Sequence, residues 1–434
     1  MVGAGVLAIA GLLGAVAEPV TLREAATTGQ VTRVVLELKA SGRYEPEGSK
    51  PLDLKVEERL DFVEKVAAVD GDGTPRRVVR RVNQAAAAVG GKVLPDARSI
   101  RPEVAILVAE RRPDGPFVFS PGGPLTRAEL DLVEGPADPL ELAALLPTKP
   151  VAVGDRWNVA DPASRSLSDY DALAVNGLEA TLEAVDDAAA KVALKGEVRG
   201  AVLGGEGTIR IVGGFTFDRK RGRIDSLTID RAEVRKAGPV EAGLDIKSTL
   251  KLTRRDAETP PELTDAALAA VPLEPAAELQ ALRFEAPEGS YTIAHGRDWH
   301  LFTESIKRVV LKQLDRGEVV ALCSLAPGPR VGPGRHQDLA QFRADIRAAI
   351  GKHFVRFDEE GELPVADRGF GYRVVAEGKV GETPVIWIYD LLASPEGEQL
   401  IATFALTESR AKDFGDSDLR IIGSFRWGAR PDPR

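Results

Sequence analysis

The chain has 434 residues, too many for one ordinary domain core, which indicates two domains. Hydrophobic residues make up 44% and charged residues 28%, so the composition excludes the disordered class. The formal net charge of −9 argues against a nucleic-acid partner, because phosphate backbones select basic surfaces. The single cysteine, Cys323, excludes an intramolecular disulfide, and its apolar, strand-like surroundings predict a buried, unreactive thiol.

The N-terminal segment has the pattern of a signal peptide. Residues 2–16 carry no charged or polar side chain, and the run closes on Ala15-Val16-Ala17. This matches an apolar core followed by a cleavage site, and it is shorter than the ~20 residues of a membrane-spanning helix. We therefore expect residues 1–17 to be a signal peptide cleaved after Ala17. The mature chain, without a transmembrane span, is then expected to be periplasmic or extracellular. The run is not preceded by a basic residue, which leaves a retained anchor or an upstream start as alternatives.

Alternation of apolar and polar residues predicts antiparallel strands throughout residues 18–255. Glu58 is the one charged residue on the apolar face of its strand. Two short helices are expected between the strand groups, with Thr126 and Asp138 as N-caps, lying against one face of the sheet. The strand-like stretches are 34–41, 54–62, 178–184, 192–198, 209–217, 224–229 and 244–252.

A change of composition at residues 256–283, with several prolines and an alanine-rich turn, predicts a linker. Residues 284–427 then follow a different order of elements. An amphipathic helix is predicted through Leu339, Phe342, Ile346 and Ile350, whose spacing places them on one face. Strands are expected at 291–293, 299–302, 372–376, 385–392 and 400–406, with a hairpin at 309–325. The expected fold class is α+β: a large curved antiparallel sheet domain with short helices at 18–255, and a smaller domain of antiparallel sheet plus helix at 284–427.

The C-terminal third, residues 284–427, resembles the PsbP-like and DcrB-like domain family. The resemblance implies an antiparallel sheet packed on helices, and roles in assembly, binding or scaffolding outside the cytoplasm. It supplies no catalytic residues. The Gly/Pro-rich insertion at 327–335 departs from the compact family pattern. The residues that carry the resemblance are Tyr291, Trp299, 321–323, 386–391, 395–397, 400–404 and 421–425.

The N-terminal part is similar to uncharacterised secreted bacterial β-rich domains. The segments that carry this similarity are 119–126, 145–147 and 153–157. The expected architecture, a large curved sheet crossed by short helices, also resembles lipoprotein-carrier folds. A shared architecture does not fix a shared function.

The four histidines are the candidate metal ligands or catalytic bases of this sequence. His295 and His300 flank Asp298, so a site of two histidines and one carboxylate can be drawn, but a loop-to-strand segment does not fix ligand geometry. His336 and His353 flank the amphipathic helix and are expected to act at its ends. We therefore assign no metal-binding, cofactor-binding or catalytic residue and expect no cofactor.

Residues 70–74, Asp-Gly-Asp-Gly-Thr, resemble the start of a calcium loop. The twelfth position is Arg81, where a calcium loop needs a glutamate, so we interpret the segment as a hairpin turn. The basic cluster Arg76, Arg77, Arg80 and Arg81 follows it. On a helix this cluster would form a stripe suited to an anionic lipid or polysaccharide; on a strand it would form ion pairs with the acidic remainder, which we favour.

Two functional hypotheses from different classes follow. The first is a non-enzymatic envelope protein that binds or scaffolds a lipid, peptide or protein partner. The alternative is a hydrolase acting on envelope material, with a site assembled from scattered loops. Carboxylates or histidines that converge in a cleft would favour the hydrolase, and an apolar groove without such a cluster would favour the binding protein.

Overall fold

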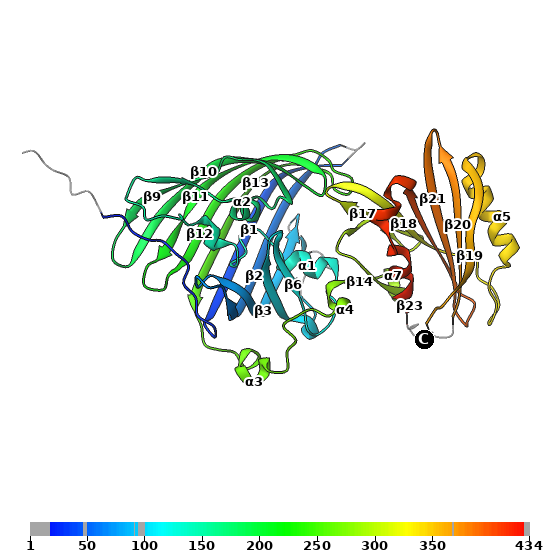
Figure 1. The fold of residues 1–434 in the computed structure, drawn as a ribbon, viewed down its shortest axis with the longest axis horizontal. Coiled ribbons are helices and arrows are strands. Elements are labelled where there is room, and N and C mark those ends of the chain that lie inside the picture. The colour runs from blue at the N-terminus through cyan, green and yellow to red at the C-terminus, as the bar shows by residue number, and fades with distance from the viewer. Residues whose placement is uncertain (1–17, 47–49, 91, 94–99, 367–368, 429–434) are drawn as a thin grey trace, which may run out of the picture.

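The computed structural model of the protein describes residues 18–46, 50–90, 92–93, 100–366 and 369–428. It contains antiparallel sheets of 13, seven and three strands with short helices (Figure 1). The expected α+β class, with a large antiparallel sheet and a smaller sheet with helices, is confirmed. The predicted signal peptide, residues 1–17, lies outside the described residues. In the described part of the chain, no helix has the length and apolar character needed to cross a membrane.

The 13-stranded sheet is formed by residues 31–256. Its order is β6-β5-β3-β2-β1-β13-β12-β11-β10-β9-β7, with β4 beside β3 and β8 beside β10. The last strand, β13, therefore returns to pair with the first. The strands are β1 (Val31–Glu45), β2 (Leu52–Val69), β3 (Pro75–Val89), β4 (Lys92–Val93), β5 (Ile106–Arg112), β6 (Gly115–Phe119), β7 (Arg156–Asn158), β8 (Ala172–Asn176), β9 (Glu179–Val185), β10 (Ala189–Val202), β11 (Gly205–Asp218), β12 (Arg223–Arg235) and β13 (Gly243–Asp256).

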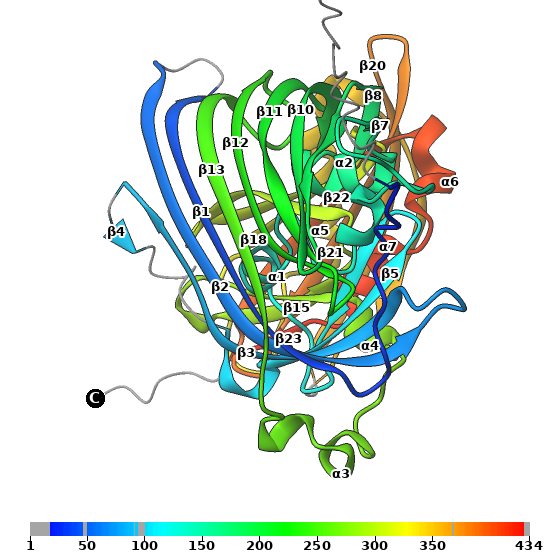
Figure 2. The same cartoon turned by 90° about the vertical axis from the view of Figure 1, so that its left-hand side faces the viewer.

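The alternation of the sequence gives this sheet one apolar and one polar face. Leu36 of β1 lies opposite Leu60 of β2 and Leu252 of β13, and all three are buried. Lys39 and Glu57 lie opposite each other on the neighbouring strands, and both side chains are exposed. Because side chains alternate along a strand, a shift of one residue would exchange the two faces. The long strands curve along their length (Figure 2).

The apolar face is covered by the chain between β6 and β8. This segment contains α1 (Arg127–Val133), η2 (Leu142–Leu145) and α2 (Asp161–Ser168), and its buried residues belong to the main core. Helix α1 begins as predicted, with Thr126 and Glu129 forming a capping box. The prediction of a helix beginning at Asp138 is wrong: only a single 3-10 turn, η2, forms there. The Asp138 carboxylate instead accepts hydrogen bonds from Arg80 and from the Leu140 backbone.

The predicted linker packs against the outside of the large sheet. It contains η3 (Pro261–Leu263), α3 (Asp265–Leu268) and α4 (Ala277–Gln280). Leu263 is fully buried in a second apolar cluster with Val63, Val79, Val108 and Phe119. The Lys65 ammonium donates to the Leu263 carbonyl at 2.9 Å. This end of the sheet is thus buried on both faces. The prediction of a linker at residues 256–283 did not include this packing.

The remainder of the chain forms the two smaller sheets. The helix predicted at Leu339–Ile350 is confirmed as α5, and its apolar face packs on Val374, Ala376 and Leu391. Two short helices follow, α6 (Ala411–Phe414) and α7 (Ser417–Gly423). The three-stranded sheet has the order β14 (Leu282–Glu285), β15 (Tyr291–His295) and β23 (Arg426–Trp427). The seven-stranded sheet has the order β16 (Trp299–Ser305), β17 (Arg308–Asp315), β18 (Glu318–Pro327), β22 (Gln399–Thr407), β21 (Thr383–Ala393), β20 (Phe370–Val380) and β19 (Phe354–Leu363).

The basic cluster lies on strand β3 and forms ion pairs, as the favoured interpretation predicted. Arg80 is only 2% exposed and donates two hydrogen bonds of 2.7 Å to Asp138, and its Nε lies 3.3 Å from Glu64. Its guanidinium also lies over the Phe62 ring at 4.8 Å. Arg77 pairs with Glu110 at 2.7 Å. The two hydrogen bonds from Arg80 to Asp138 join the large sheet to the segment that covers it. Such two-point, charge-assisted hydrogen bonds are among the strong ones in proteins.

We predict that Arg80→Leu lowers the free energy of unfolding by about 3–5 kcal/mol, because Asp138 and Glu64 would be left buried without their cation. Urea denaturation followed by tryptophan fluorescence measures this change. Arg210→Leu is the control, since the Arg210 side chain is 76% exposed and its ion pair with Glu197 should contribute less than ~1 kcal/mol. Equal effects of the two substitutions would contradict the prediction.

Candidate functional site

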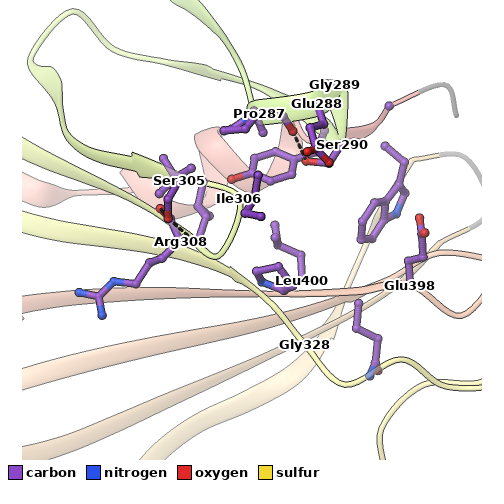
Figure 3. Close-up of a pocket in the computed structure, with 18 of the residues that line it drawn as sticks. Pro287, Glu288, Gly289, Ser290, Ser305, Ile306, Arg308, Gly328, Glu398 and Leu400 are labelled. Atoms are coloured by element: carbon purple, nitrogen blue, oxygen red, sulfur yellow. Dashed lines mark hydrogen bonds between the residues drawn. The ribbon is translucent and has the colours of Figure 1, made fainter. Parts of the chain in front are cut away.

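A cavity of about 360 Å³ lies between the three-stranded and seven-stranded sheets (Figure 3). Five chain segments that are distant in sequence form its walls. They are residues 286–291, 305–309, 325–330, 398–400 and 427–428. Its volume falls in the ordinary range of small-molecule pockets.

One rim of the cavity is a tight turn at Glu288 and Gly289. Both residues have left-handed backbone angles, with φ of 60° and 64°. The Gly428 amide donates to the Ser290 carbonyl at 2.9 Å. A Cβ atom at Gly428 would lie 1.5 Å from the Gly289 carbonyl oxygen, so this backbone approach requires glycine. The turn before β15 and the chain after β23 are thereby held together.

The Gly/Pro-rich insertion forms the opposite wall, through Pro327, Gly328 and Arg330. Its backbone is hydrogen-bonded to the turn that precedes β22. Gly328 donates to the Gln399 carbonyl at 2.8 Å, and Val331 donates to the Gly397 carbonyl at 3.0 Å. The segment that departs from the PsbP-like pattern is therefore an ordered part of the cavity wall.

The interior of the cavity is mostly apolar. Val309, Leu325 and Leu400 line it and are buried in the core of this part of the chain. Ile306 also lines it, in the turn between β16 and β17, and is 61% exposed. The Ser305 hydroxyl closes this turn by donating to the Arg308 carbonyl at 3.1 Å. An apolar surface with one exposed apolar residue at its edge suits the non-polar part of a ligand.

Two polar side chains in the wall lack hydrogen-bond partners. Tyr291 of β15 and Trp427 of β23 lie directly opposite each other in the strand pair. Tyr291 is 5% exposed, and burial raises the pKa of its hydroxyl. The Tyr291 Oη and Trp427 Nε1 atoms are both buried and without a partner among the described residues. Because most buried polar atoms are hydrogen-bonded, these two donors are unsatisfied polar groups within an otherwise apolar wall.

The histidines and acids singled out in the sequence lie outside this cavity. His295 Nδ1 bonds to the Gly296 carbonyl at 2.8 Å, while Asp298 accepts from Gln313 at 2.7 Å. Burial, followed by the charge of Arg127, lowers the pKa of His300 to about 4. In the described ranges, no group of three or more His, Cys, Asp or Glu residues is arranged to hold a metal ion.

A smaller cavity of about 260 Å³ is lined by His295, Asp298 and Ser417, which are the residue types of a hydrolytic triad. The Ser417 hydroxyl donates to the Phe414 carbonyl at 2.6 Å. His295 bonds to its neighbouring backbone, so among the described residues no hydrogen bond joins the serine to the histidine. A nucleophile without its base does not support acyl transfer.

The two remaining histidines and the cysteine contact neighbouring protein groups and lie outside the cavity. The His336 ring stacks on Phe370, with 3.7 Å between ring centroids, shortly before α5 begins. His353 Nδ1 bonds to the Lys379 carbonyl at 2.8 Å, just after α5 ends. Cys323 is fully buried, as predicted, and burial raises the pKa of its thiol well above the usual value. The predicted inert character of this thiol follows from its inaccessibility.

One carboxyl group in the C-terminal part of the chain, residues 282–428, has a strongly raised pKa, and it lies away from the cavity. Asp390 of β21 is buried, and neither of its oxygens has a hydrogen-bond partner among the described residues. Burial, followed by repulsion from Asp418, raises the pKa of Asp390 to about 8. Arg373 opposes this shift but bonds to Asp418, at 2.8 Å. This shift favours the protonated form of Asp390 in the folded protein at neutral pH.

We predict that the contribution of Asp390 to stability falls as the pH rises from 3.8 to about 8, because over this range Asp390 is protonated when folded and ionised when unfolded. A single proton limits the slope to about 1.4 kcal/mol per pH unit. Asp390→Asn should remove this contribution, so its advantage over wild type should grow with pH. Urea denaturation at several pH values tests this, and a pH-independent difference would contradict it.

Comparison with known proteins gives distant structural likenesses. No family model and no curated protein matches the sequence. The Ran-binding protein Mog1p of Saccharomyces cerevisiae has 10% identity over 34% of this chain and 95% of its own, with a TM-score of 0.27. The cyanobacterial PsbP of Synechocystis sp. PCC 6803 has 12% identity over 34% of this chain and 92% of its own, with a TM-score of 0.26. The resemblance to Mog1/PsbP-like domains thus extends over about a third of the chain.

Two further solved structures are similar to other fractions of this chain. Lipovitellin has 10% identity over 54% of this chain and 26% of its own, with a TM-score of 0.30. A protein of Bacteroides thetaiotaomicron has 10% identity and a TM-score of 0.26, over 35% of this chain; the chain spans half of that protein's length. At such low scores, function is argued from the residues of this chain alone.

Proposed function

We propose that the protein is an exported, non-enzymatic binding protein whose 360 Å³ cavity holds part of an amphipathic lipid, with a carbonyl or carboxylate oxygen at Tyr291 and Trp427. The observation that carries the proposal is the pair of buried, unpartnered donors in an apolar wall. A fatty acyl group has both matching features, a hydrocarbon chain and an oxygen acceptor at one end. Each methylene removed from water contributes about 0.8 kcal/mol.

The charges around the cavity suit an acidic head group. Arg308 and Arg330 both line it, are exposed, and form no ion pair in the described part of the chain. An arginine guanidinium binds carboxylate or phosphate oxygens in a two-point geometry. Glu288 and Glu398 also line the cavity, so its entrance carries both signs of charge. A fatty acid or an acidic phospholipid therefore fits better than a neutral sterol.

The hydrolase hypothesis finds little support in this cavity. Among the described residues that line it, there is no histidine, cysteine or aspartate. Its two serines are engaged, since the Ser290 hydroxyl donates to the Pro287 carbonyl and the Ser305 hydroxyl donates to the Arg308 carbonyl. Neither serine has a general base as its hydrogen-bond partner, which nucleophilic catalysis would need.

We predict that Ile306→Asp weakens the binding of dodecanoate at least about tenfold, because it places a carboxylate at the apolar edge of the cavity and repels an acidic ligand. Binding is measured by isothermal titration calorimetry on the full chain. Val355→Asp is the matched control: Val355 is 59% exposed, similar to Ile306, and does not line the cavity. Equal affinities of the two variants, or no binding by wild type, would refute the proposed site.

Tyr291→Phe separates a binding role from a structural one. Removing a buried hydroxyl that has no partner should raise the free energy of unfolding of the unliganded protein by about 1 kcal/mol. The same substitution should weaken dodecanoate binding, because the ligand loses a donor. Tyr44→Phe, at an exposed tyrosine on β1, should change neither quantity. A destabilised Tyr291→Phe variant with unchanged affinity would show that the hydroxyl is structural.

A further inference from the structure

Two adjoining hollows of about 500 and 230 Å³ lie on the covered side of the large sheet, away from the lipid cavity. They share Glu134, Gly135, Asp169 and Val202 in their walls. The larger hollow also touches the smaller part of the chain, through His300 and Leu301 of β16. The two hollows together form an elongated space, which is lined by Arg127 and Asp131 of α1 and by Pro162 and Arg165 of α2.

Acidic groups dominate the lining of this space. Glu58, Asp131 and Glu241 lie only in the larger hollow, Glu134 and Asp169 lie in both, and Glu141 lies only in the smaller one. Arg127, Arg165 and Arg231 also line it, so the acidic groups outnumber the cationic ones. Three of the carboxylates have a cation: Asp131 pairs with Arg127 at 3.9 Å, Glu134 with Arg297 at 3.3 Å and Glu241 with Arg235 at 3.1 Å. Among the described residues, Glu58, Glu141 and Asp169 form no ion pair and accept no side-chain hydrogen bond. Glu58 is the charged residue that interrupts the apolar face of β2 in the sequence.

Glu141 is the most enclosed of these groups. It is 4% exposed, yet its carboxylate lacks a partner in the described part of the chain and lines the smaller hollow. Burial, followed by the charge of Asp138, raises the pKa of Glu141 to about 7. The pKa of Asp131 is raised by desolvation and lowered by Arg127, but its side chain is 64% exposed, so Glu141 is the more informative group. Because Glu141 has no cation of its own and lines the hollow, a cationic ligand there would stabilise its ionised form.

We propose that this space binds a linear polyamine, with one ammonium group near Glu141, one near Glu134 and Asp169, and one near Glu58 and Glu241. The carboxylates are distributed along the space, and no group of them among the described residues is compact enough to hold a metal ion. This distribution suits charges spaced along a flexible chain. Val202, which lines both hollows, and Pro136 and Leu203 in the larger one provide apolar surface for the methylene groups between the ammonium groups.

The test is isothermal titration calorimetry of the full chain with spermidine at low ionic strength. We expect one spermidine per chain, and weaker binding of the shorter diamine putrescine. Glu141→Gln and Asp169→Asn should each reduce spermidine affinity about tenfold, the effect of one lost charge-assisted contact. Glutamine keeps the shape of Glu141 and removes an uncompensated buried charge, so a melting temperature at or above that of wild type shows that the variant is folded.

Matched controls separate a built site from general attraction to an acidic protein. Glu183→Gln and Asp187→Asn remove exposed carboxylates elsewhere on the large sheet and should leave spermidine affinity unchanged. Equal losses in the control variants, several spermidines per chain, or no preference for spermidine over putrescine would overturn the proposal. Tighter binding of tri-lysine than of spermidine would also overturn it, because the site would then belong to a peptide. Dodecanoate binding is independent of these outcomes.

Discussion

The fold depends on the pairing of β1 with β13. These strands are about 200 residues apart, and their register runs without interruption from Thr32 opposite Asp256 to Glu45 opposite Gly243. This contact places the first and last strands of the large sheet at its centre, so β2 to β6 extend on one side and β12 to β7 on the other. The segment between β6 and β7 must then cross the apolar face, which is where α1 and η2 lie.

Burial of charge follows from this arrangement. A segment that crosses a curved sheet brings its own polar groups into the interior, and each must be paired there. The Arg80–Asp138 pair meets this need between β3 and the covering segment, and the pair of Arg254 with Glu24, at 2.7 Å, meets it for the N-terminal segment. Glu141 lies in the same covering segment without such a pair. Within this one segment, Asp138 is therefore paired with a cation and Glu141 is not.

Local patterns were sufficient to predict individual elements and insufficient to predict what they assemble. The alternation at Leu36 and Leu38 indicated β1, and the spacing of Phe342, Ile346 and Ile350 indicated α5, because each depends on neighbours a few residues away. β19 was not predicted: it is an edge strand whose side chains are mostly exposed, so it lacks an apolar face. The cavity between the smaller sheets joins segments from 286 to 428, and local patterns predicted strands at several of its walls but not that these walls would meet.

The unpaired groups of the two cavities have opposite chemistry, hydrogen-bond donors in one and carboxylate acceptors in the other. The cavity between the smaller sheets presents donors, Tyr291 and Trp427, in an apolar wall, which selects an acceptor attached to hydrocarbon. The elongated space under the large sheet presents acceptors, with Glu141 the most enclosed, which selects a donor carrying positive charge. An acidic lipid would be repelled from the second space, and an isolated polyamine would leave the donors of the first unsatisfied. The two proposed sites would therefore select ligands of opposite chemistry.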